Sequence, residues 1–150
     1  MICEAVKSAF VHQMKEWETK ENCKNGGMKC LYKVSYFLVS FAFIYQLMYF
    51  FLSQVDHVGD DVLTGTHKTS DWFGFIDNMR FKFFDTANGD CSVEAFSEST
   101  VPFAYIDFGV NYCNIHNLVH AVAGNEPTRY TEVTRDEVCT QYSSANCQKY

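Results

Sequence analysis

Three side chains that can bind a metal or move a proton fall close together late in the chain. Cys113, His116 and His120 are three and four residues apart, so on a helix they would share one face. Thiolates and imidazoles are the usual zinc ligands, and this spacing can bring three donors together. No fourth ligand is evident, so we expect Cys113 to form a disulfide and both histidines to make ordinary polar contacts. A metal site at these three residues is the alternative.

The remaining sequence patterns do not indicate catalysis. There is no glycine-rich phosphate loop, and no base or oxyanion motif accompanies a Cys–His pair. The segment around Asn88 fails as an EF-hand calcium loop, because Phe84 and Ala95 would stand at ligand positions. We therefore expect a protein that is not an enzyme, with no catalytic residues, no metal and no cofactor.

Four cysteines in the second half of the chain suit two disulfides: Cys91, Cys113, Cys139 and Cys147. Such bonds persist in an oxidising compartment. Four cysteines allow three connectivities, and sequence alone does not choose among them. The turn-forming residues 142–146 favour the pairing of Cys139 with Cys147. The alternative is four reduced, buried cysteines in a reducing compartment.

An uncharged run of 22 residues, 34–55, separates two polar parts of the chain. As a helix it would be about 33 Å long at ~1.5 Å per residue, enough to cross a bilayer core. The run therefore predicts a single-pass membrane protein with three parts. These are an N-terminal amphipathic and juxtamembrane segment (1–33), the transmembrane helix (34–55) and a small C-terminal domain (56–150). A buried core helix of a soluble protein is the alternative.

Charge is divided unevenly about this run and predicts an orientation. Residues 1–33 carry a net charge of +2, and residues 56–150 carry −8. The positive-inside rule places the N-terminus on the cytoplasmic or matrix side. The C-terminal domain would then lie in an extracellular, lumenal or intermembrane space. Its acidic balance argues against nucleic acid as a partner.

One face of the predicted span carries small and hydrogen-bonding residues, as helix–helix packing in membranes requires. An unpartnered amide such as that of Gln46 costs free energy inside a bilayer. We expect this face to contact another protein; the alternative is a lone anchor. The packing residues are Ser35, Val39, Ala42, Gln46, Tyr49 and Ser53.

Residues 4–20 have the spacing of an amphipathic helix, which would lie on a membrane surface or on a partner. In the C-terminal domain, Asn88-Gly89 predicts a two-residue type I′ turn between strands. That turn would set Phe81 opposite Phe96 and Phe84 opposite Val93. A second strand is expected near residues 101–113, then a helix over 114–122, a loose strand over 129–134 and a last helical turn. The prediction is a disulfide-stapled α+β domain beside one transmembrane helix.

Two function classes fit these observations. The first is a non-catalytic accessory subunit of a larger membrane complex, with the other subunits and the lipid bilayer as partners. The second is a signal-anchored ectodomain for extracellular binding or adhesion. The polar face of the span favours the first class.

Overall fold

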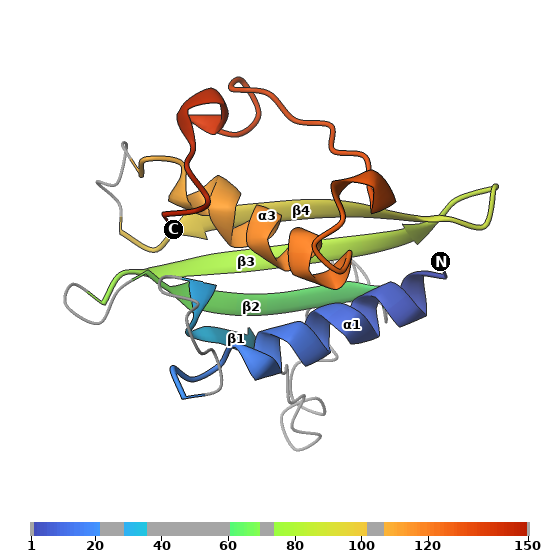
Figure 1. Ribbon diagram of the computed structural model, residues 1–150, viewed down its shortest axis with the longest axis horizontal. Coiled ribbons are helices and arrows are strands. Elements are labelled where there is room, and N and C mark those ends of the chain that lie inside the picture. The colour runs from blue at the N-terminus through green and yellow to red at the C-terminus, as the bar shows by residue number, and fades with distance from the viewer. Residues whose placement is uncertain (1, 22–28, 36–60, 70–73, 102–106, 150) are drawn as a thin grey trace, which may run out of the picture.

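A four-stranded antiparallel sheet with two helices on one face organises the molecule (Figure 1). The computed structural model describes residues 2–21, 29–35, 61–69, 74–101 and 107–149. Sheet order follows chain order, β1-β2-β3-β4. The elements are α1 (Cys3–Glu16), β1 (Tyr32–Ser35), β2 (Val62–Lys68), β3 (Ile76–Asp85), β4 (Cys91–Ser99), α3 (Val110–Val122) and the 3-10 turns η2 (Pro127–Arg129) and η3 (Tyr142–Ser144).

The two faces of the sheet follow from the alternation of side chains along β3. Asp77, Met79, Phe81 and Phe83 are buried, and the residues between them point to the other face. Phe81 is fully buried and stacks edge-on against Phe10 of α1, with ring centroids 5.1 Å apart. The core therefore lies between the inner face of the sheet and the two helices.

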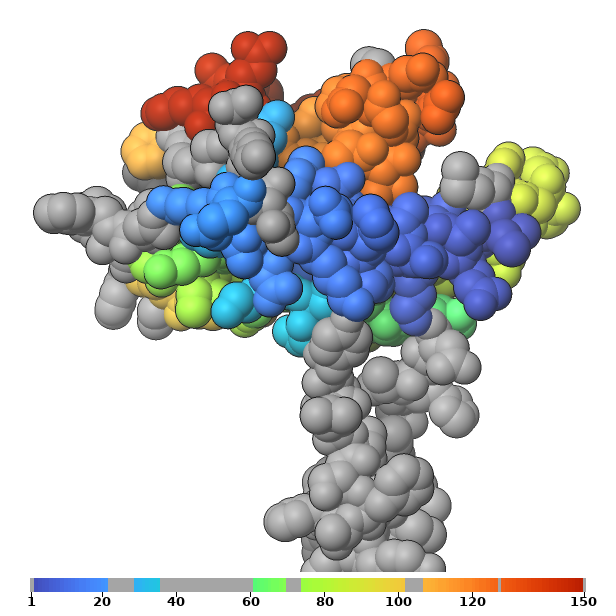
Figure 2. Space-filling view, turned by 60° about the horizontal axis from the view of Figure 1, so that its bottom comes forward, coloured from blue at the N-terminus to red at the C-terminus, as the bar shows by residue number. Residues whose placement is uncertain are grey.

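The amphipathic helix of the N-terminal segment packs on the sheet. Phe10 and Met14 are buried in the core, and Trp17 is partly buried beside it. Gly65 of β2 allows this close approach, since a Cβ there would clash with the Met14 side chain and lie 2.6 Å from the Lys33 carbonyl oxygen. Figure 2 shows α1 (blue) across the front of the molecule, where it contacts α3.

The membrane prediction is wrong. Val34 and Ser35, the first residues of the expected span, are the last residues of β1 and pair with Gly65 and Thr64. Residues 36–55 lie outside the described residues, and with them five of the six expected packing residues: Val39, Ala42, Gln46, Tyr49 and Ser53. In the described ranges no helix has the length and apolar character needed to cross a bilayer.

The predicted orientation is wrong for a related reason. α1 buries its apolar side on strands that follow the expected span, and Cys3 of α1 is disulfide-bonded to Cys91 of β4. Two segments in direct covalent and packing contact do not lie on opposite sides of a membrane. The structure is a small α+β domain, and its two disulfides between described residues are compatible with an oxidising compartment.

The hairpin between β3 and β4 is present, but its turn and register differ from the prediction. The Thr86 amide donates to the Asp90 carbonyl at 2.8 Å, and Gly89 has a φ of 78°. Asn88 does not have a positive φ, so the loop is a three-residue turn ending in a glycine bulge rather than type I′. The extra residue moves the register by one. Phe81 faces Ala95, and Phe83 faces Val93.

The segment after β4 also differs. Residues 102–106 of the expected second strand lie outside the described residues, and α3 begins at Val110, four residues before the predicted helix. The Asp107 carboxylate accepts hydrogen bonds from the amides of Gly109 and Asn111, both at 3.0 Å, and so binds the start of this helix. Residues 130–134 have no regular secondary structure and do not pair into the described sheet, so the expected loose strand over 129–134 is not formed.

Candidate functional site

A buried polar network joins α3 to the inner face of the sheet. The Asn114 side-chain amide donates to Asp77 Oδ2 at 2.8 Å and to Ser97 Oγ at 3.3 Å. The hydroxyl of fully buried Tyr32 donates to the backbone carbonyl of Asn114 at 3.0 Å. Ser97 Oγ in turn donates to Asn111 Oδ1 at 2.7 Å. Each bond links a strand to α3, so the network orients the helix on the sheet.

His67 belongs to the same network. It lies opposite Asp77 in the β2–β3 register, and its ring stacks on Tyr32 with centroids 4.3 Å apart. Its Nε2 atom is 3.0 Å from the Cys30 carbonyl oxygen. Because a carbonyl only accepts, we assign the hydrogen to Nε2. The environment of His67 and Asp77 is closed to solvent, which indicates a structural role.

Burial dominates the titration of this network. It raises the pKa of Asp77 above its ordinary value, although the hydrogen bond from Asn114 and the nearby His67 oppose the shift. Burial also raises the pKa of Tyr32, whose phenol therefore stays protonated as the donor to Asn114. The protonated carboxyl of Asp77 is thus favoured in the folded state relative to the unfolded chain.

A pH dependence of stability follows from the raised pKa of Asp77. Protonated Asp77 contributes fully to the free energy of unfolding below the unfolded-state pKa of about 3.9. This contribution is lost as pH rises through the higher pKa of the folded state. Asp77→Asn should remove this slope, because asparagine keeps an oxygen for Asn114 but does not ionise. Urea unfolding at pH 4, 5, 6 and 7 measures the difference. If the difference in free energy of unfolding between wild type and Asp77→Asn stays constant over this pH range, the raised pKa of Asp77 is contradicted.

A second polar group lies on the more exposed side of α3 and reaches the C-terminal segment. The Tyr112 hydroxyl donates to Glu132 Oε2 at 3.1 Å and lies 3.0 Å from His116 Nδ1. Since the hydroxyl hydrogen goes to the carboxylate, His116 Nδ1 must donate to the Tyr112 oxygen. The His120 ring stacks nearly parallel to that of His116, with centroids 5.8 Å apart. Partial burial and the charge of Glu132 raise the pKa of Tyr112.

Cys113, His116 and His120 all lie on α3 at the spacing of one helix face, but Cys113 is not available to bind a metal. Cys113 is buried and bonded to Cys147, so its sulfur is not a thiolate ligand. Among the described residues no group of three or more His, Cys, Asp or Glu side chains has a geometry that could hold a metal ion. The tyrosine and glutamate contacts of His116 instead tie the C-terminal segment to the helix.

Of the four cysteines predicted to pair with one another, Cys113 and Cys147 do so, whereas Cys91 and Cys139 do not. Cys91 is bonded to Cys3, which lies 88 residues earlier and outside the predicted set of four. Cys147 is bonded to Cys113, so the favoured pairing with Cys139 is wrong. Cys139 is a free cysteine whose pKa is raised by burial and by nearby carboxylates, those of Asp107 and Glu132 among them.

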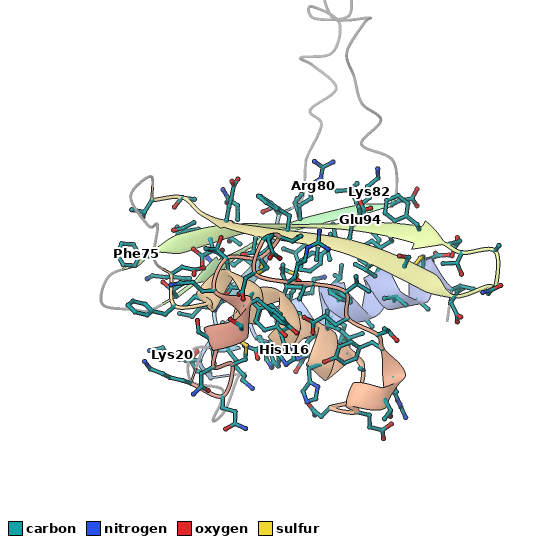
Figure 3. All side chains as sticks on the ribbon, turned by 90° about the horizontal axis from the view of Figure 1, so that it is seen from above. Lys20, Phe75, Arg80, Lys82, Glu94 and His116 are labelled. Carbon is teal, nitrogen blue, oxygen red and sulfur yellow. A yellow bond between two sulfur atoms is a disulfide. The ribbon has the colours of Figure 1, made fainter. Side chains whose placement is uncertain are left out.

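The outer face of the sheet, opposite both helices, is a third functional candidate (Figure 3). We call four of its residues the outer-face cluster: Arg80, Lys82, Phe84 and Phe96. Arg80 lies directly opposite Phe96, which is 58% exposed. Lys82 Nζ lies over the Phe84 ring, 4.9 Å from its centroid. Neither Arg80 nor Lys82 forms a salt bridge within the described part of the chain.

Sequence reasoning missed this cluster because it paired Phe81 with Phe96 on one face. In the observed register the two rings lie on opposite faces. The signal was nevertheless present, since Arg80, Lys82 and Phe84 alternate with Phe81 and Phe83 along one strand. Comparison with protein-family models, curated proteins and solved structures gives no match to this chain.

Proposed function

We propose that the protein is a non-catalytic binding subunit, an accessory component of a larger assembly, which docks through the outer-face cluster. The observation that carries this proposal is Phe96, an exposed aromatic ring directly opposite Arg80. Aromatic and arginine side chains supply most of the binding free energy at the centres of protein interfaces. In this proposal they would do so from a hydrogen-bonded sheet, where little backbone freedom is left to lose on binding.

The chemistry of the cluster indicates the surface that it binds. Arg80 offers a planar guanidinium that can bind a carboxylate through two parallel hydrogen bonds. Phe96 offers apolar area beside it. The complementary surface is therefore a shallow apolar patch that carries at least one carboxylate.

The experiment is to size the native particle that contains the tagged chain after mild extraction. We expect a particle larger than the 17.3 kDa chain. A variant carrying both Arg80→Glu and Phe96→Ser should release the chain as a small monomer, because it reverses the charge and removes the exposed ring.

Arg135→Glu is the matched control. Arg135 is 72% exposed and lies in the C-terminal segment, away from the sheet. This control should leave the particle intact. A wild-type chain that runs as a small monomer, or a double variant that stays in the particle, would sink the proposal.

A second candidate function is that of an extracellular binding or adhesion module. It is favoured by the Cys3–Cys91 and Cys113–Cys147 disulfides, which are typical of small domains in oxidising compartments. In that case the outer-face cluster would bind a ligand on another surface, and the chain extracted alone would be monomeric.

A further inference from the structure

The hydrogen-bonding phase of β4 leaves one side of the strand open. The Thr86 amide donates to Asp90, and the Thr100 amide donates to Ile76. Bonded pairs in an antiparallel ladder recur at every second residue, so the even-numbered residues of β4 bond to β3. The amides and carbonyls of Val93, Ala95 and Ser97 therefore point away from β3.

Nothing in the described part of the chain pairs with this edge. β4 is the last strand of the sheet, and the described residues form no backbone hydrogen bond to the outward groups of Val93, Ala95 or Ser97. Figure 3 looks onto the β4 side of the sheet, with the C-terminal segment on the helix side. Natural edge strands are usually shortened, or blocked by proline, by charged side chains (lysine above all) or by a bulge. β4 spans nine residues without proline, lysine or a bulge, its register with β3 is unbroken, and its charged residues are glutamates.

The side chains of β4 indicate which strand would pair with it. Glu94 and Glu98 project from the outer face, on either side of exposed Phe96. Neither carboxylate forms a salt bridge within the described ranges. Residues directly opposite each other on neighbouring strands interact, and like charges there are unfavourable. An added strand with lysine or arginine at the two positions opposite these glutamates, four residues apart on one face of the strand, is therefore favoured.

We propose that the free edge of β4 binds an extended basic segment of a protein partner as a fifth strand of the sheet. Backbone hydrogen bonds to Val93, Ala95 and Ser97 would supply affinity, and Glu94 and Glu98 would select basic side chains. The inference rests on the proposed function in requiring a protein partner. It adds a contact at the sheet edge that does not involve Arg80 or Lys82.

The test uses the full-length protein and a labelled nine-residue peptide of alternating lysine and valine, followed by fluorescence anisotropy. A peptide with glutamate in place of lysine is the charge control. We expect the lysine peptide to bind at least about ten-fold more tightly. The double variant Glu94→Lys and Glu98→Lys should invert this preference.

Ala95→Pro tests the backbone contact. Its amide faces the open edge, where proline removes an outward donor without removing a bond to β3. We expect roughly ten-fold weaker binding of the lysine peptide, whereas Ala95→Thr, the matched control, should bind like the wild type. Methylating alternate peptide amides should also abolish binding, which tests the contact even if Ala95→Pro does not fold.

Equal binding of the two peptides, or full binding of the methylated one, would overturn the proposal. Arg80→Glu with Phe96→Ser separates the two sites. If this variant leaves the native particle yet still binds the lysine peptide, both the outer-face and the edge contacts are supported. If the native chain is monomeric, and the lysine peptide binds but its methylated form does not, the proposed function is rejected and the edge contact is supported.

Discussion

Removing the disulfide between α1 and β4 should lower the free energy of unfolding by about 3–5 kcal/mol. The bond joins residues 88 apart in sequence, and closing a loop of that size restricts the unfolded chain strongly. Replacing both Cys3 and Cys91 by serine avoids leaving an unpaired thiol. Urea unfolding followed by circular dichroism measures the loss.

The free cysteine supplies the control for this change. Cys139→Ser removes a thiol that closes no loop, so its effect should stay below about 1 kcal/mol. The account is contradicted if the double variant at Cys3 and Cys91 unfolds at the same urea concentration as Cys139→Ser. Such a result would mean that the bond between Cys3 and Cys91 does not stabilise the folded protein.

Phe81→Ala should destabilise the fold by about 3–5 kcal/mol, because it removes a fully buried ring from the centre of the core. Its ring packs against Phe10, so the substitution also loosens the contact between β3 and α1. Unfolding in urea at a fixed pH gives the difference from wild type.

Phe96→Ala is the matched control, since it removes the same ring from the neighbouring strand. Phe96 is 58% exposed on the outer face, so the change should cost less than about 1 kcal/mol. Similar losses from both variants would instead place Phe81 and Phe96 on one face, as the sequence predicted. The pair therefore tests the register of the hairpin as well as the core.

Local patterns along the chain predicted local structure. The spacing of Phe10 and Met14 correctly indicated an amphipathic helix near the N-terminus, although the surface that it covers is the sheet. Asn88-Gly89 correctly located the hairpin. The turn type was wrong because Gly89 alone adopts the positive φ in this loop, which adds one residue and shifts every facing pair.

Contacts between distant parts of the chain were beyond such patterns. Hydropathy registers the apolar character of a run, but it does not show that Val34 pairs with Gly65 in a sheet. The same limit hid the bond between Cys3 and Cys91, because the expected span assigned these residues to opposite sides of a membrane. The outer-face cluster depends in turn on the hairpin register.

Direct mapping of the disulfides is the sharpest test that α1 and the sheet form one stapled unit. The non-reduced protein is alkylated, digested and analysed by mass spectrometry. The account predicts one linked peptide pair containing Cys3 and Cys91, another containing Cys113 and Cys147, and an alkylated Cys139. A bond from Cys91 to Cys113, Cys139 or Cys147 would contradict it.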